Sequence, residues 1–144
     1  MARTDELAQR FDMHFFPSSP PALAARSSLR TASEDLEVDV ALKHDAENRP
    51  DFVAPIYPVI PKQFQVPSDA PPLFVAAAND DAIPKPVQHS VRLYAARSDA
   101  GKPAALHIYS EGGHGFGMKT RNLPIDSWKD RLLDWMTLQH LATR

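Results

Sequence analysis

The chain has 144 residues, of which 43% are hydrophobic and 24% charged, the usual proportions of a globular domain with its own core. Its net charge of −2 offers no basic surface for nucleic acid or an anionic membrane, and no apolar run approaches the roughly 20 residues of a membrane span. Cysteine is absent, which excludes disulfides and thiol nucleophiles, and without a signal-peptide stretch at the N-terminus we expect a cytoplasmic protein.

Glycine is concentrated in one short segment of the chain. The sequence has 14 prolines but only 5 glycines, and four of these lie in Glu111-Gly112-Gly113-His114-Gly115-Phe116-Gly117. No glycine precedes Gly101, so the first 100 residues contain no phosphate-binding loop, no dinucleotide-binding fingerprint and no glycine-flanked nucleophile turn. We therefore expect no nucleotide or other cofactor.

The N-terminal third has weak local patterns. Phe11 to Phe16 fits a short buried strand, and Ala22 to Leu29, which follows Pro20-Pro21, fits a helix. Thr31-Ala32-Ser33-Glu34 fits either a capping box that opens a second helix, running to about Lys43, or an exposed loop.

Two apolar segments of the central region are typical of buried strands. Phe52 to Ile60 is interrupted by prolines, which cannot donate to a sheet ladder, so we expect this strand to end near Pro58. Leu73 to Ala78 lies between Pro71-Pro72 and Asn79-Asp80-Asp81, which predicts a central strand that ends in a polar loop.

The C-terminal part alternates helices with a strand. Val87, Val91, Tyr94 and Ala95 recur at helical spacing and predict a helix that stops at Gly101. Leu106 to Tyr109 is the next expected strand. An amphipathic C-terminal helix is predicted from Ile125, Trp128, Leu132, Trp135, Met136 and Leu141. Together these elements predict an α/β domain with a mostly parallel sheet flanked by helices.

Acidic and imidazole side chains follow two successive strands. Asp80 and Asp81 come directly after one strand, and His114 follows the next. Sites in parallel sheets lie at the carboxyl ends of the strands, where neighbouring loops are side by side. A carboxylate there can fix the tautomer of an imidazole whose other nitrogen acts as a base. The alternatives are a turn or capping role for either aspartate and an ordinary loop histidine.

We expect no metal site. His107, His114 and an aspartate could supply zinc ligands, but their spacing matches no tight ligand motif. His107 lies inside a predicted strand and is expected in the core or at a sheet edge. The remaining histidines are expected at the surface: His14, His44, His89 and His140.

Three segments, in order, resemble segments of a known family. They are Arg49-Pro50-Asp51-Phe52-Val53 leading into Ile56-Tyr57-Pro58-Val59-Ile60, Ala70-Pro71-Pro72-Leu73-Phe74-Val75 leading into Asn79-Asp80-Asp81, and Tyr109-Ser110-Glu111-Gly112-Gly113-His114-Gly115-Phe116-Gly117. The stretch from Pro50 to Leu141 resembles the C-terminal half of the α/β-hydrolase fold. It is most similar to bacterial esterases of the acetyl-xylan-esterase and dienelactone-hydrolase-like groups. Their Ser-Asp-His triad implies Asp81 as the acid, with Asp80 as the alternative, and His114 as the base.

The resemblance also implies a nucleophile near the start of the chain. Leu23-Ala24-Ala25 looks like the start of the helix after the nucleophile turn, which puts Ser18 at the nucleophile position. Phe16 and Pro20 then replace the two glycines of the Gly-x-Ser-x-Gly motif. Ser19 is an alternative, and a plain loop without catalytic serine is another.

The implied protein is one half-size domain, 1–144, with a divergent segment 1–49 and a hydrolase-like half 50–144. The family's first four strands and the loop that gives one oxyanion-hole N–H have no counterpart. Loss of such a donor costs roughly 2.7–4 kcal/mol of transition-state stabilisation, so weak or absent activity is expected. The nucleophile strand, which is central in the family, would here be an exposed edge, and we expect it to be covered by a second copy of the chain or by residues 1–17.

The resemblance implies hydrolysis of small carboxylic esters through a Ser-His-Asp arrangement. The alternatives are an inactive hydrolase-like module or fragment that serves only binding or assembly, and a gene fragment or shifted reading frame without an evolved function. No nucleic acid, membrane, metal or cofactor partner is expected in any of these cases.

Overall fold

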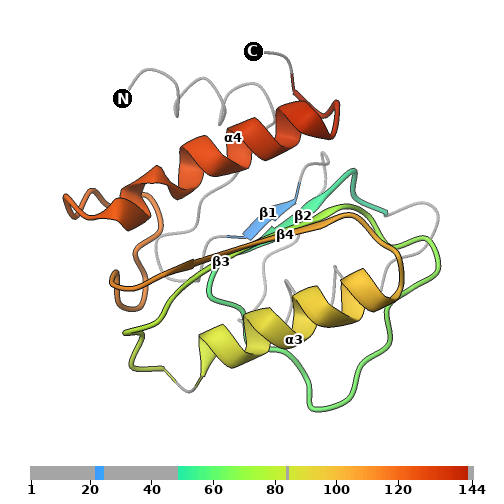
Figure 1. Cartoon of the computed structure of the whole chain (residues 1–144), viewed down its shortest axis with the longest axis horizontal. Coiled ribbons are helices and arrows are strands. Elements are labelled where there is room, and N and C mark those ends of the chain that lie inside the picture. Colours follow the sequence, from blue (N-terminus) through green and yellow to red (C-terminus); the bar gives the residue numbers. More distant parts are fainter. Residues whose placement is uncertain (1–21, 25–48, 84, 143–144) are drawn as a thin grey trace.

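The structure is a computed structural model that describes residues 22–24, 49–83 and 85–142. Its elements are strands β1 (Ala22–Ala24), β2 (Val53–Pro55), β3 (Leu73–Ala78) and β4 (Ala104–Tyr109), helices α3 (Pro86–Asp99) and α4 (Trp128–Leu138), and the 3-10 turn η1 (Pro124–Ser127). The strands form one sheet in the order β1-β2-β3-β4. Helix α3 covers one face of the sheet and α4 the other (Figure 1). The predicted α/β class is confirmed, since β2, β3 and β4 are parallel.

Strand β3 is the centre of the core. All six residues of its Leu-Phe-Val-Ala-Ala-Ala sequence are buried, because helices cover both faces and strands lie on both sides. Successive side chains alternate between the faces. Leu73 and Val75 pack with Leu93 of α3, whereas Phe74 and Ala76 belong to the cluster that includes α4. The prediction of a central strand over Leu73 to Ala78 is confirmed.

Strand β2 is short because of its prolines. It ends at Pro55, and one further bridge joins Ile56 to Ala76 of β3. The N–H of Tyr57 then donates to the carbonyl of Ala76 at 2.7 Å. The strand therefore ends before Pro58, as predicted. The connection from β2 to β3 contains no helix.

Helix α3 buries a different face from the one predicted. Its extent and its end before Gly101 are confirmed, but Val91 is exposed, and the buried residues are Pro86, Ser90, Leu93 and Arg97. The polar members made this face hard to recognise from apolar periodicity. Arg97 is buried because its Nη1 donates to the carbonyl of Pro71 at 2.7 Å.

The C-terminal helix is confirmed with the predicted buried face. The cluster on the α4 side of the sheet includes Trp128, Leu132, Trp135 and Met136 of this helix. Several members of this cluster are aromatic, and Trp135 packs against Phe74 with ring centroids 5.7 Å apart. Helix α4 ends at Leu138, three residues before the predicted Leu141.

The predicted helix from Ala22 is wrong at its first residues. Ala22–Ala24 form the edge strand β1, which runs antiparallel to β2 with Leu23 opposite Ala54. Pairing with β2 outweighs the helix propensity of these alanines, since propensity is a weak local preference. Strand 11–16 and helix 31–43 of the sequence analysis lie outside the described residues.

The two edges of the sheet differ. Strand β1 covers the outer side of β2. The nucleophile strand, whose edge was expected to be covered, precedes Ser18 and lies outside the described residues. At the other edge is β4, where Pro103 and Tyr109 direct their carbonyls to β3. By alternation, Ala104, Leu106 and Ile108 direct their N–H and C=O groups outward, where they pair with nothing among the described residues. None of the helices in the described part of the chain is long and apolar enough to cross a lipid bilayer.

We expect a second copy of the chain to pair with β4, because a six-residue edge strand that is unpaired within the described ranges is a template for further strands. Ile108→Pro removes an outward N–H without removing a bond to β3, so it should yield a folded monomer, whereas Ile108→Thr should remain a dimer. Light scattering on the three proteins measures this. A monodisperse monomer for the wild-type chain would contradict the expectation.

Candidate active site

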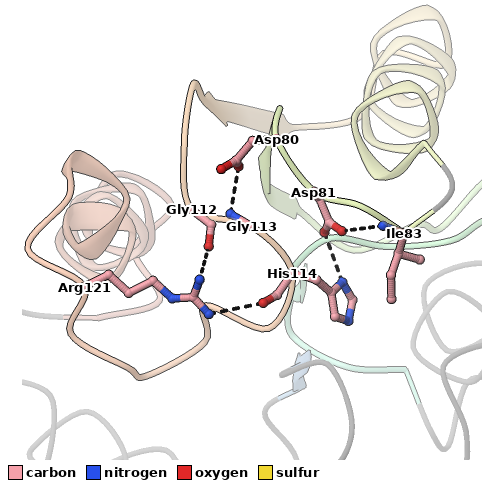
Figure 2. Close-up of polar contacts among 7 residues, drawn as sticks. All are labelled: Asp80, Asp81, Ile83, Gly112, Gly113, His114 and Arg121. Atoms are coloured by element: carbon pink, nitrogen blue, oxygen red, sulfur yellow. Dashed lines mark hydrogen bonds and ion pairs between the residues drawn. The ribbon is translucent and has the colours of Figure 1, made fainter.

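The loops after β3 and β4 bring an acid and a histidine together. The two strands pair in register up to Ala78 opposite Tyr109, so both loops leave the sheet at the same level. Oδ2 of Asp81 lies 3.0 Å from Nδ1 of His114 (Figure 2). The predicted neighbourhood of these loops is therefore observed, and Asp81 rather than Asp80 contacts the imidazole.

The Asp81 carboxylate is buried and doubly hydrogen-bonded. Its side chain is 0% exposed, and its Oδ1 accepts a hydrogen bond from the N–H of Ile83 at 2.9 Å. Because a carboxylate accepts at both oxygens, Nδ1 of His114 is the donor of their shared hydrogen bond. In the neutral imidazole the remaining nitrogen, Nε2, then has a free lone pair.

The His114 ring is partly open to solvent and is supported on one face. Its side chain is 32% exposed, and Nε2 has no hydrogen-bond partner among the described residues. The ring of Tyr57 lies against it, with centroids 4.7 Å apart, and Tyr57 in turn meets Phe116 edge-on at 5.0 Å. This arrangement places a partly exposed imidazole beside two aromatic rings.

Asp80 bonds the loop after β3 to the loop that bears His114. Its Oδ1 accepts a hydrogen bond from the N–H of Gly113 at 2.7 Å, and the side chain is exposed. The backbone N–H groups of Gly113 and Gly112 hold the pKa of Asp80 below its usual value of 3.8. Asp80 thus joins the two loops, whereas the local turn bond expected of one of the two aspartates is made by Asp81, to the N–H of Ile83.

The glycines permit the close approach of this loop to the sheet. A Cβ added at Gly112 would lie 2.3 Å from Cδ1 of Ile125 and 3.3 Å from Cβ of Ala78. Gly113, with φ of 61°, adopts a left-handed conformation that favours glycine. The loop therefore sits directly on Ile125 and the end of β3.

Two contributors to the site were missed from the sequence. Tyr57 follows β2 as Asp81 follows β3. The rule that sites in parallel sheets lie at the carboxyl ends of the strands could therefore have identified Tyr57 as well. Arg121 donates hydrogen bonds from its guanidinium to the carbonyls of Gly112 and His114, the latter at 3.2 Å. No sequence signal connects Arg121 to these carbonyls.

The proposed nucleophiles Ser18 and Ser19 lie outside the described residues. Their assignment used Leu23-Ala24-Ala25 as the start of a helix, and the strand at Ala22–Ala24 removes that support. His107, half-buried in β4, stacks on Phe74 with centroids 4.9 Å apart, and burial lowers its pKa from 6.5. No group of three metal-ligating side chains occurs in the described ranges.

Several solved structures are similar to this chain. An α/β-hydrolase enzyme from a Medee basin deep-sea metagenome library has a TM-score of 0.59 and 21% identity over 74% of this chain and 50% of its own. A carboxylesterase from Lactobacillus plantarum has a TM-score of 0.60 and 17% identity over 76% of this chain and 56% of its own. The chain has part of the α/β-hydrolase fold.

A further similar structure is an acetyl ester-xyloside bifunctional hydrolase from Caldicellulosiruptor lactoaceticus, with a TM-score of 0.58 and 23% identity over 67% of this chain and 45% of its own. The chain thus spans about half the length of the α/β hydrolases it matches. No known family profile matches the chain, and no curated protein sequence does. The comparisons confirm the partial α/β-hydrolase fold, and the esterase activities named are those of the similar proteins.

Gly112→Ala should destabilise this half of the hydrolase fold by about 1–3 kcal/mol, because its Cβ overlaps Ile125. Ile125→Val removes the overlapping Cδ1, so the double variant should be more stable than the sum of the single changes predicts. Urea denaturation of the four proteins measures the coupling. Additive changes would contradict the steric explanation.

The hydrogen bond from the N–H of Gly113 to the Asp80 carboxylate should weaken in acid. The depressed pKa of Asp80 means that the bond to Gly113 is at full strength above pH 3.8 and is lost as the pH falls through the lower folded-state value. Carboxyl NMR titration and exchange of the Gly113 amide test this. In Asp80→Asn the amide should exchange faster, with no acid step; an unchanged step would contradict the assignment.

Proposed function

We propose that the chain hydrolyses small carboxylic esters, with His114 as general base and Asp81 as the group that orients it. The observation that supports this most is the 3.0 Å contact between Nδ1 of His114 and the buried carboxylate of Asp81. It directs the lone pair of Nε2 away from the acid, toward the partly exposed side of the ring. The fold shared with solved hydrolases and esterases supports the same class of reaction.

In the proposed mechanism a serine hydroxyl attacks the ester carbonyl while Nε2 of His114 takes its proton. We propose Ser18 as this serine, with Ser19 as the alternative. The buried Asp81 carboxylate stabilises the imidazolium that forms. The imidazolium then returns the proton to the leaving alkoxide, which departs as an alcohol. Water, deprotonated by His114 in the same way, attacks the acyl-serine, and the carboxylic acid and free hydroxyl result.

A second candidate is a hydrolase-like module without catalysis, which serves binding or assembly. The observation that favours it is the absence of a Gly-x-Ser-x-Gly turn, together with the strand at Ala22–Ala24 where a helix would follow such a turn. In that case the bond between Asp81 and His114 would only join the two loops. The two candidates differ in one measurable property, ester turnover that depends on His114.

Hydrolysis of p-nitrophenyl acetate tests the proposal. His114→Ala should reduce the rate to background, and Asp81→Asn should reduce kcat by roughly 100-fold or more, because the imidazole loses its oriented tautomer. His140→Asn is the matched control, since His140 is exposed and its left-handed φ of 57° suits asparagine. This control should keep the wild-type rate.

The nucleophile is tested with Ser18→Ala and Ser19→Ala. Loss of turnover in the first variant alone supports Ser18, and loss in the second alone moves the role to Ser19. If both serine variants remain active while His114→Ala is inactive, His114 activates water and the acyl-enzyme step is wrong. Equal rates for the wild type and His114→Ala would overturn the hydrolase proposal.

A further inference from the structure

We infer that Arg121 is a positioning residue for His114: its guanidinium fixes the backbone from Gly112 to His114 and so sets the place of the imidazole relative to Asp81. This inference rests on the proposed function for its kinetic consequence. Its structural part concerns only the hydrogen bond between the side chains of His114 and Asp81. We call the contacts of Arg121 with Gly112 and His114 the arginine clamp.

The segment that bears His114 needs such a restraint. No helix or strand lies between the end of β4 at Tyr109 and the start of η1 at Pro124. Glycines make up four of the seven residues from 111 to 117, and a glycine-rich backbone loses the most conformational entropy when it is ordered. The bond from His114 to Asp81 fixes only the side chain, so the position of the imidazole also depends on what holds the backbone of this glycine-rich segment.

The arginine clamp restrains a single peptide group together with Asp80. Nη1 of Arg121 donates to the carbonyl of Gly112, while the N–H of Gly113 donates to Asp80 Oδ1 at 2.7 Å. That carbonyl and that N–H belong to the same peptide unit, which is therefore bonded at both ends (Figure 2). The opposite charges of Asp80 and Arg121 lie on its two sides, and Arg121 contributes to lowering the Asp80 pKa.

The second nitrogen of the guanidinium acts on the histidine itself. Nη2 of Arg121 donates to the backbone carbonyl of His114 at 3.2 Å. The two bonded carbonyls therefore lie on either side of Gly113 in the sequence. A planar guanidinium can donate to both at once, whereas a lysine ammonium is a point charge on a flexible stem.

The arginine is in turn held by the turn before α4. Both carboxylate oxygens of Asp126 accept from the N–H of Arg121, at 3.1 and 3.0 Å, and Oδ2 also accepts from the N–H of Asn122 at 2.8 Å. Asp126 belongs to η1, and so does the adjacent Ile125, which is fully buried and lies close to Gly112. The clamp thus connects His114 to the packed base of α4.

The test compares Arg121→Met, Arg121→Lys and Arg131→Met. Arg131 is the matched control, because it is a half-exposed arginine of α4 whose ion pair is with Asp134 and not with the loop. The first measurement is NMR of the His114 Nδ1–H in protein labelled with ¹⁵N-histidine. We expect a slowly exchanging Nδ1–H in the wild type and in Arg131→Met, its loss in Arg121→Met, and partial retention in Arg121→Lys.

The second measurement is ester hydrolysis with kcat and KM determined separately. Displacement of a base without loss of substrate contacts should lower kcat of Arg121→Met by about 10- to 100-fold and leave KM within about twofold. A further variant, Arg121→Ala, leaves space for a guanidinium ion, and this ion, added well below denaturing concentrations, should restore part of kcat there but not in His114→Ala.

The outcomes separate the two proposals. An unchanged Nδ1–H in folded Arg121→Met, judged by circular dichroism, would overturn the clamp whatever the kinetics show. If the wild type lacks His114-dependent turnover but Arg121→Met loses the Nδ1–H, the proposed function fails and the clamp stands as a structural restraint on the imidazole. Equal loss of the Nδ1–H in Arg131→Met would also overturn the clamp.

Discussion

The buried carboxylate of Asp81 is the constraint on which the candidate site depends. A carboxylate without solvent is strongly unfavourable unless hydrogen bonds replace the lost water. Here the N–H of Ile83 and the Nδ1–H of His114 supply them, one to each oxygen. The acid therefore depends on the imidazole, because without it one oxygen of a fully buried carboxylate would lose its hydrogen-bond donor.

This pairing is possible because the sheet sets the height of both loops. Strand β3 is buried on both faces. It pairs with β4 without a bulge, from Leu73 opposite Ala104 to Ala78 opposite Tyr109. The residues directly after the two strands must then leave at the same level. Tyr57, after the shorter β2, adds the aromatic support from the other side of β3. Three neighbouring strands thus contribute one side chain each to a single small region.

The sequence was most informative where one local pattern determined the outcome. The run of Leu73 to Ala78 is apolar throughout and bounded by polar turns, so its strand and the strand-end positions of Asp81 and His114 could be predicted. The buried face of α3 could not, because the polar Arg97 becomes buried through a carbonyl of a distant turn. The strand at Ala22–Ala24 likewise exists through pairing with β2, and the roles of Tyr57 and Arg121 arise from contacts between distant residues.

The three alanines that end β3 have a consequence for how this sequence can diverge. A Cβ at position 112 would lie 3.3 Å from Cβ of Ala78, so the loop passes over the end of the strand with no room for a larger side chain between them. A bulkier residue at position 78 would lift the loop and carry the imidazole away from its acid, although position 78 touches neither. The residues that position 78 can accept are therefore limited by the distance between His114 and Asp81. A change at 78 would have to occur together with changes at 112 and 125.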